Sequence, residues 1–504
     1  MDFDSVVTNG IVVTASEVLP AGLDLGIKDG KIACIGTSLP RSSKTSIIDA
    51  EGAYITPGGV DSHVHLSQKN SPTGDTWETG SRSAIAGGTT TILAFASQPK
   101  TEQTLWPTLE DYKSKSTDQV YCDYGFHFIL TNPTPEIIRD ELPVLVEKEG
   151  ITSVKLYMTY EAMKLNDREI LRILFACKAL GMTTMIHAES HDIISMIIEG
   201  LERNKTTDPF FHAIARPRIA EDEASYRAIS LAELADSPML LVHMSSDVAV
   251  AHVREAQTRL LPIHAETCPH YLFLLSEKIK GEPHDHFSGA KHVCSPPLRH
   301  EVKDLEGLWQ NIANGTFTTF SSDHAPSKYG HPGGKQLGIV DGAAKFSKIP
   351  NGLPGVETRM ALLFGQTPAC QEAENTKLSL PRFVQLTATN PAKLYGLDGV
   401  KGSIAPGYDA DLVIWHPGKT GATTISQSML HHDIDYTPFE GIEVGNWPRY
   451  TILRGEVVWD QSRGIVGKMG QGRYLKRGKG QVLVGKTGNI PRGMTVDERQ
   501  YWTA

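Results

Sequence analysis

The chain has 504 residues, of which 40% are hydrophobic and 21% charged, as is typical of a globular protein rather than a disordered one. The formal net charge is −9 and no basic run stands out, which argues against nucleic acid as a partner. No apolar run approaches the ~20 residues that span a bilayer, so no membrane partner is expected.

The N-terminus and the cysteines indicate a cytoplasmic protein. The segment MDFDSVVTNGIVV lacks a basic stretch and a small-residue cleavage site, so we do not expect it to be a secretory signal. It is predicted to be a strand region with a turn at Asn9-Gly10. The six cysteines are scattered without a CxxC pair, which favours free thiols over a disulfide scaffold.

Both ends of the chain are predicted to be rich in strands. Residues 1–55 contain short apolar runs separated by turns, including one at Asp29-Gly30, and show no long helical pattern. The region 396–470 contains further runs of β-branched and aromatic residues, such as 411–415. We expect these two regions to form one small β-sandwich domain, followed by a C-terminal extension over 471–504.

The central region, 56–395, alternates short β-branched or aromatic runs with longer windows of helical periodicity, such as 167–180 and 221–235. Eight strands are predicted, over 60–66, 89–95, 123–130, 153–158, 183–189, 239–245, 262–268 and 317–323. Eight such units predict an α/β fold in which a TIM-like (β/α)8 barrel carries the small β-sandwich domain.

Residues of the types that bind metals fall on several of these predicted strands. His63 and His65 are two residues apart, so in a strand both side chains point to one face. Further candidates lie within or at the end of later strands, namely Lys155, His187, His243 and Asp323. The active site of a (β/α)8 barrel forms at the carboxyl ends of its strands, so these six residues would converge there.

The ordered set is more informative than any of its members. A single histidine at a strand end is commonly a hydrogen-bonded structural residue, a buried lysine is normally paired, and an aspartate after an apolar run can cap a helix. Together, however, imidazoles suit zinc and similar divalent ions, and a carboxylate adds an anionic ligand. Two such ions about 3.5–4 Å apart also need an anionic bridge between them.

The stretches around these residues include ITPGGVDSHVHL (55–66), SVKLYMTY (153–160), IHAES (186–190), LLVHMSS (240–246), ETCPHYL (266–272), CSPPLR (294–299), SSDHAP (321–326) and IPNGLPGVETRM (349–360). Together they resemble the cyclic amidohydrolases of the amidohydrolase superfamily, and most of all the dihydropyrimidinases and hydantoinases. The resemblance covers nearly the whole chain.

The resemblance implies a site with two divalent metal ions, expected to be Zn²⁺. His63 and His65 would bind the more buried ion, and His187 and His243 would bind the second. Lys155 would be N6-carboxylysine, a carbamate formed with CO₂, whose two oxygens bridge both ions. An ammonium has three donors and no acceptor, so unmodified lysine could not be this ligand.

The resemblance also assigns roles in catalysis and substrate binding. Asp323 would bind the first metal ion and act as the catalytic acid and base. Tyr160 would donate to the oxygen of the reacting carbonyl. Tyr160 would thereby also bind the substrate, together with backbone groups of Ser295 and Asn351 that hold the ring.

The implied reaction is the hydrolysis of a cyclic amide C–N bond, which opens a dihydropyrimidine or hydantoin ring to an N-carbamoyl amino acid. Two cations would lower the pKa of a bound water, and Asp323 would pass a proton to the leaving nitrogen. The expected partner is therefore a small cyclic amide. The resemblance further implies a homotetramer, in which the C-terminal extension could reach a neighbouring subunit.

Two alternatives stay open. The stretch Ser67-Gln68-Lys69 is more polar than in dihydropyrimidinases, and His324-Ala325-Pro326 resembles allantoinase-like or dihydroorotase-like sequences. The same two-metal machinery could thus act on another cyclic ureide, imide or lactam. The other alternative is a non-catalytic scaffold relative, but such proteins lose metal ligands and this chain retains all six.

Overall fold

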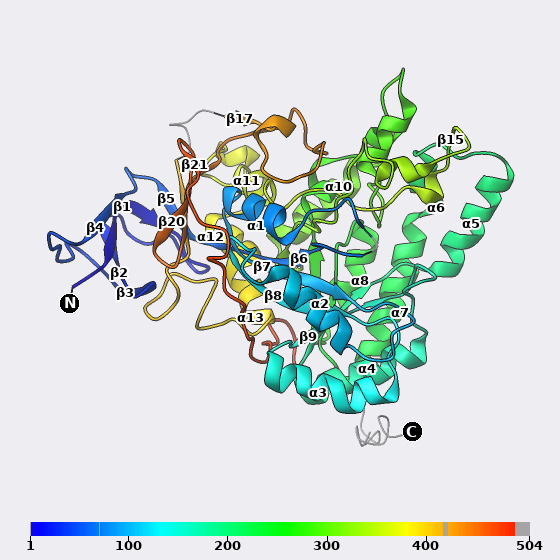
Figure 1. Cartoon of the computed structure of the whole chain (residues 1–504), viewed down its shortest axis with the longest axis horizontal. Helices are drawn as coiled ribbons and strands as arrows, with labels where there is room; N and C mark the ends of the chain where they lie inside the picture. Colours follow the sequence, from blue (N-terminus) through cyan, green and yellow to red (C-terminus); the bar gives the residue numbers. More distant parts are fainter. Residues whose placement is uncertain (1, 70, 417–421, 489–504) are drawn as a thin grey trace.

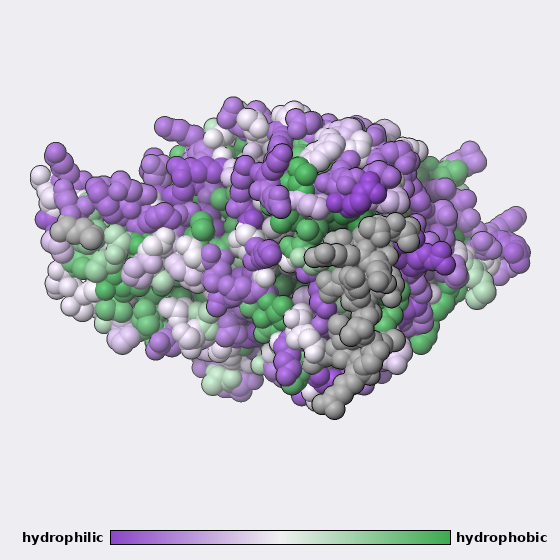
Figure 2. All heavy atoms as spheres, turned by 90° about the horizontal axis from the view of Figure 1, so that it is seen from below, coloured by the Kyte–Doolittle hydropathy of each residue, from purple (hydrophilic) through white to green (hydrophobic). Residues whose placement is uncertain are grey.

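The structure is a computed structural model that describes residues 2–69, 71–416 and 422–488. Two sheets organise these residues (Figure 1). One is an eight-stranded sheet in the order β13-β12-β11-β10-β9-β8-β7-β6, and the other is a nine-stranded sheet built from both ends of the chain. On the face shown in Figure 2, hydrophilic and hydrophobic residues are interspersed.

The eight-stranded sheet is a parallel barrel. Its strands are β6 (Gly59–Val64), β7 (Thr89–Ser97), β8 (Asp123–Ile129), β9 (Ser153–Tyr157), β10 (Thr183–His187), β11 (Met239–Leu241), β12 (Ile263–Thr267) and β13 (Thr319–Phe320). At the closure of the barrel, a β-bridge joins Val64 at the end of β6 to His324 beyond β13. The His65 N–H also donates a 2.8 Å hydrogen bond to the His324 carbonyl. The prediction of an α/β barrel is confirmed.

Two barrel strands end three or more residues earlier than the sequence predicts. β11 and β13 stop before His243 and Asp323, although the predicted strands run through both residues. The φ angles of His243 and Asp323 are 40° and 47°, in the left-handed region that cannot continue a strand. The backbone therefore turns at two of the six positions where the sequence predicts metal ligands.

Helices lie between the strands and around the barrel (Figure 1). They are α1 (Trp77–Ala86), α2 (Trp106–Ser116), α3 (Leu142–Val144), α4 (Asp167–Leu180), α5 (His191–Arg203), α6 (Phe211–Ala215), α7 (Arg218–Ala235), α8 (Asp247–Thr258), α9 (Pro269–Phe273), α10 (Val302–Ala313), α11 (Arg359–Phe364), α12 (Leu380–Val384) and α13 (Asn390–Leu394). The helix α4 begins at a capping box of Asn166 and Glu169 and ends at Gly181. Within the described ranges, no helix has the length and apolar character needed to cross a membrane.

The nine-stranded sheet joins the two ends of the chain. Its strands are β1 (Ser5–Val12), β2 (Leu23–Lys28), β3 (Lys31–Gly36), β4 (Ser46–Asp49), β5 (Tyr54–Pro57), β16 (Leu412–Trp415), β19 (Pro448–Leu453), β20 (Glu456–Asp460) and β21 (Gly464–Ile465). β5 pairs with β16, so N-terminal and C-terminal strands share one sheet, as predicted. Two further ladders pair β14 (Ile339–Val340) with β15 (Ala343–Ala344) and β17 (Thr423–Thr424) with β18 (Glu443–Val444).

The predicted turn at Asn9-Gly10 is wrong, because β1 runs straight through this dipeptide. The pairing of β1 with β2 advances from Val7–Leu25 to Gly10–Leu23, so β1 carries one residue more than its partner. Asn9 adopts a φ of 56° at this point. The dipeptide therefore forms a β-bulge, after which β1 pairs with β5.

The described part of the C-terminal extension lies against the barrel of its own chain. The Arg473 carbonyl accepts from the Tyr124 N–H at 2.9 Å, and the Arg477 N–H donates to the Gly150 carbonyl at 3.0 Å. The Arg477 side chain is buried and donates to Ser153 Oγ at 2.9 Å. Residues 473–488 thus contact the rest of their own chain. The expected reach of the extension to a neighbouring subunit stays a prediction, and residues 489–504 lie outside the described ranges.

A buried ion cluster fastens the terminal sheet to the barrel. Lys401 Nζ lies 2.6 Å from Asp123 Oδ2, 3.0 Å from Asp409 Oδ2 and 2.8 Å from Asp411 Oδ2. Asp123 begins β8 of the barrel, whereas Asp411 directly precedes β16 of the terminal sheet. Burial would lower the pKa of Lys401, but the three carboxylates raise it above its usual value.

We expect Lys401→Met to lower the free energy of unfolding by about 3–5 kcal/mol, because the three carboxylates lose the buried cation that they share. Denaturant unfolding measures the change. The matched control is Lys31→Met, which removes a half-exposed lysine 2.8 Å from Asp409 and should cost less than about 1 kcal/mol. Equal losses for the two variants would contradict the importance of the buried cluster.

Candidate metal centre

The predicted site residues lie together around one cavity of about 320 Å³ at the carboxyl end of the barrel strands. Its wall includes His65, Lys155, Tyr160, His187, His243, Ser295, Asp323 and Asn351. His63 lies behind this wall and is fully buried. We call His63, His65, Lys155, His187, His243 and Asp323 the metal-ligand set; that they bind metal remains a prediction.

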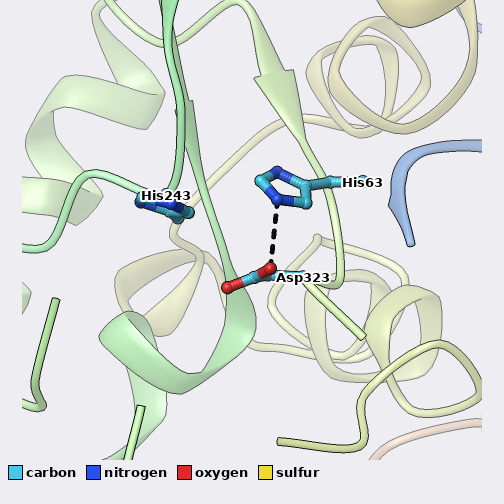
Figure 3. Close-up of side chains that lie close together, drawn as sticks. All are labelled: His63, His243 and Asp323. Atoms are coloured by element: carbon cyan, nitrogen blue, oxygen red, sulfur yellow. Dashed lines mark ion pairs between the residues drawn. The ribbon is translucent and has the colours of Figure 1, made fainter. Parts of the chain in front are cut away.

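His63, His243 and Asp323 are the most compact part of the metal-ligand set (Figure 3). One ligand atom from each lies within 4.8 Å of the other two, and all three residues are buried. His63 Nε2 is 3.1 Å from Asp323 Oδ1, whereas His65 Nε2 is 3.6 Å from the same oxygen. Nitrogen and carboxylate donors gathered in this way fit a divalent cation.

His243 carries a polar atom that its protein surroundings do not satisfy. Its Nδ1 is buried and has no hydrogen-bond partner among the described residues. Burial, aided by His187 and Lys155, holds the pKa of His243 well below its usual value, so the ring is neutral. A neutral imidazole has a lone pair to offer, and the ring of His187 lies only 4.5 Å away between centroids. These features agree with a cation site.

Lys155 is fully enclosed in β9, with 1% of its surface exposed. Its Nζ lies 2.7 Å from His63 Nε2 and 4.6 Å from the centre of the Phe95 ring. Burial lowers the pKa of Lys155 to about 8, against the opposing effect of Asp323 and Glu266. The fraction of neutral amine near pH 7 is therefore higher than for an exposed lysine, and the neutral amine is the form that reacts with CO₂.

Glu266 is a site residue that the sequence analysis did not single out. Its Oε1 lies 2.6 Å from His63 Nδ1, and both side chains are fully buried. With Nδ1–H donating to this carboxylate, His63 presents Nε2 to Asp323. The signal in the sequence was an acidic residue inside the apolar strand predicted over 262–268.

A second unpredicted group orients His187. Glu189 Oε2 accepts from His187 Nε2 at 2.7 Å and from Arg216 Nη1 at 2.6 Å. Although burial alone would raise the pKa of Glu189, Arg216 and His187 lower it to about 2. The carboxylate therefore stays ionised, and His187 has only Nδ1 left as a potential metal ligand.

Tyr160 and Asn351 contact each other on the side of the cavity predicted to bind the ring. The Asn351 side-chain amide donates to the Tyr160 hydroxyl at 3.1 Å. Burial raises the pKa of Tyr160, although Arg216 opposes this, so the phenol keeps its proton at neutral pH. Ser295 is buried nearby, with Oγ 3.4 Å from His212 Nε2.

Comparison with known proteins agrees with this geometry. The model of the amidohydrolase family matches residues 54–458. The D-hydantoinase of Geobacillus stearothermophilus is 40% identical over 482 residues, which cover 95% of this chain and 98% of the relative. The D-hydantoinase of Ralstonia pickettii is 38% identical and covers 94% and 99% of the two chains.

Solved structures show the same fold at full length. A D-hydantoinase crystal structure has a TM-score of 0.87 at 38% identity, covering 94% of this chain and 99% of its own. The dihydropyrimidinase from Brevibacillus agri has a TM-score of 0.88 at 37% identity, covering 95% and 99%. The donor set at the barrel end agrees with the metal dependence of the matching family. By sequence over most of its length and by fold, the chain belongs to the amidohydrolase family.

Proposed function

We propose that the protein is a metal-dependent hydrolase that opens a dihydropyrimidine or hydantoin ring to an N-carbamoyl amino acid. The observation that carries the proposal is the convergence of the metal-ligand set, Tyr160 and Asn351 on one cavity. Similarity to D-hydantoinases over more than nine-tenths of the chain supports the class of substrate.

The metal-ligand set would hold two divalent cations, proposed to be Zn²⁺, with Lys155 as N6-carboxylysine supplying the shared anionic ligand. When bound, such cations acidify a water molecule and polarise a carbonyl group. Glu266 and Glu189 would keep His63 and His187 in fixed ring orientations. The orphaned Nδ1 of His243 supports this assignment.

Asp323 is proposed to accept the proton of the attacking water and to deliver it to the leaving ring nitrogen. Burial would raise the pKa of Asp323, but His63 and the nearby Lys155 hold it well below its usual value. The carboxylate is thus ionised at neutral pH and able to accept a proton. It lines the cavity in which the ring would lie.

Tyr160 is proposed to stabilise the oxygen that becomes negative during the attack. Because the Asn351 amide donates to its oxygen, the phenol proton remains available for the substrate carbonyl. Backbone groups of Ser295 and Asn351 would hold the ring from the other side. These two residues lie on separate segments that both line the cavity.

Location, assembly and domain limits complete the proposal. All six cysteines are free, which supports a cytoplasmic protein. The homotetramer remains a prediction from the sequence. The same holds for the domain limits, which are 1–55 with 396–470 for the β-sandwich domain, 56–395 for the barrel and 471–504 for the C-terminal extension.

The reaction class is tested with a panel of rings. We expect the zinc-loaded protein to open dihydrouracil or hydantoin more efficiently than allantoin or dihydroorotate. Ring opening is measured as the loss of ring absorbance. A chelator should abolish turnover, and added Zn²⁺ should restore it. A metal-loaded protein that opens none of these rings would overturn the proposal, and a preference for allantoin or dihydroorotate would overturn the substrate class.

Lys155→Ala tests the carbamate. We expect this variant to lose bound metal and activity together, because the shared anionic ligand is missing. Short carboxylic acids such as acetate or propionate should partly restore both, whereas Lys155→Arg should not be restored because the guanidinium fills the space. Metal analysis and ring opening measure the outcome. Two bound metal ions and near-normal turnover in Lys155→Ala would refute the assignment.

Tyr160→Phe tests the oxyanion role separately from metal binding. Removal of one donor to a developing oxyanion is expected to lower kcat about 100-fold or more. Bound metal should stay at the wild-type level, since the Tyr160 hydroxyl contacts Asn351 rather than the metal-ligand set. Unchanged kcat, or a parallel loss of metal, would argue against this role.

A further inference from the structure

Lys335 is a fully buried lysine outside the metal-ligand set. It is 0% exposed and begins a short 3₁₀ turn, Lys335–Gly338, in the Gly-rich segment after Pro326. Among the described residues, no carboxylate lies within ion-pair distance of its Nζ. Burial lowers the pKa of Lys335 to about 7, whereas its hydrogen bonds to carbonyl oxygens favour the charged form. A buried ammonium without a counter-ion is costly, so its contacts must compensate.

The three protons of Nζ match three backbone carbonyls. Lys335 Nζ donates to the carbonyl of Val293 at 3.1 Å, of Pro350 at 2.6 Å and of Gly352 at 2.8 Å. An ammonium has three donors and no acceptor, so this geometry uses it completely. Val293 lies two residues before Ser295, and Pro350 and Gly352 flank Asn351. One cation therefore joins the two segments that are proposed to bind the ring.

The contact with Pro350 also fixes a peptide plane. In a trans peptide the C=O and the following N–H point in opposite directions. Because the Pro350 carbonyl points to Lys335, the N–H of Asn351 points away from it. Pro350 and Asn351 both line the cavity of the metal centre. Lys335 thus determines how the backbone at Asn351 is presented.

The neighbouring backbone has little freedom to find another arrangement. Gly352 has a φ of 122°, and a Cβ at this position would lie 2.0 Å from the Ala325 carbonyl oxygen. Its N–H donates to the Val293 carbonyl at 3.0 Å, the same oxygen that accepts from Lys335. The two segments are therefore joined by one backbone hydrogen bond and by the Lys335 ammonium that both share.

We propose that Lys335 is a positioning residue: its ammonium cross-links the 293–295 and 350–352 segments and holds the Asn351 backbone in the orientation that binds the ring. The inference rests on the proposed function, but Lys335 itself contacts neither the substrate nor a member of the metal-ligand set. Its loss should therefore affect ring binding more than chemistry or metal content.

The first test is the kinetics of Lys335→Met. We expect KM for the best ring substrate to rise about tenfold or more, with a smaller change in kcat. This pattern is typical when an interaction is lost that binds the substrate and the transition state equally well. Bound metal should equal that of the wild type. The control is Lys348→Met, an exposed lysine between Lys335 and Asn351, whose KM should be unchanged. A wild-type KM in Lys335→Met, or parallel losses of metal and kcat, would overturn the proposal.

Chemical rescue separates the charge from the volume of the side chain. In Lys335→Ala, added n-propylamine or n-butylamine should lower the raised KM several-fold, because an alkylammonium restores three donors. The neutral n-butanol should not, although it occupies a similar space. Rescue would also show that the variant is folded. Equal rescue by amine and alcohol would assign Lys335 a merely space-filling role.

A measurement without substrate tests the positioning role of Lys335 independently of the proposed function. Amide hydrogen exchange over residues 349–353 should be faster in ligand-free Lys335→Met than in Lys348→Met, with the Gly352 amide most affected. Unchanged exchange would overturn the positioning role whatever the enzyme does. Faster exchange in a protein that opens no ring would support the cross-link and refute only the proposed function.

Discussion

The short contact between Glu266 and His63 is the interaction on which the geometry of the candidate metal centre depends. Both side chains are fully buried, so each satisfies a polar group that water cannot reach. With Nδ1 engaged, the Nε2 of His63 faces Asp323 and Lys155. Three strands of the barrel, β6, β9 and β12, are thereby linked through one imidazole, and the rest of the site is arranged around it.

Backbone conformation is the second condition for the site. His243, Asp323 and Tyr160 all have positive φ angles, which are unfavourable for residues with side chains. Such residues persist where the surrounding structure holds them, and they gather at functional sites. Here the turn after each strand brings the side chain to the cavity that the three residues share.

The sequence could predict the barrel because eight apolar runs alternate with helical windows, and it could predict that the metal-ligand set gathers at one end of the barrel because its members fall on those runs. Local turn signals were less decisive. Asp29-Gly30 does form the predicted turn between β2 and β3, with φ angles of 51° and 75°. Asn9-Gly10 carries a similar signal, but pairing with two neighbouring strands makes it a bulge. Contacts such as those of Glu266 and Lys335 depend on tertiary packing, which no local signal encodes.

The three buried lysines of the described chain show why Lys155 stands apart. Lys401 is surrounded by three carboxylates, and Lys335 by three backbone carbonyls, so each ammonium is fully satisfied. Lys155 has no comparable set: its Nζ meets a histidine nitrogen and the faces of two aromatic rings. The ring faces attract a cation but accept no conventional hydrogen bond, so an ammonium has fewer acceptors here than at Lys335 or Lys401. Conversion to a carbamate would turn this position into an anion that faces the histidines and Asp323. Bound cations would then balance the negative charges of the carbamate and of Asp323.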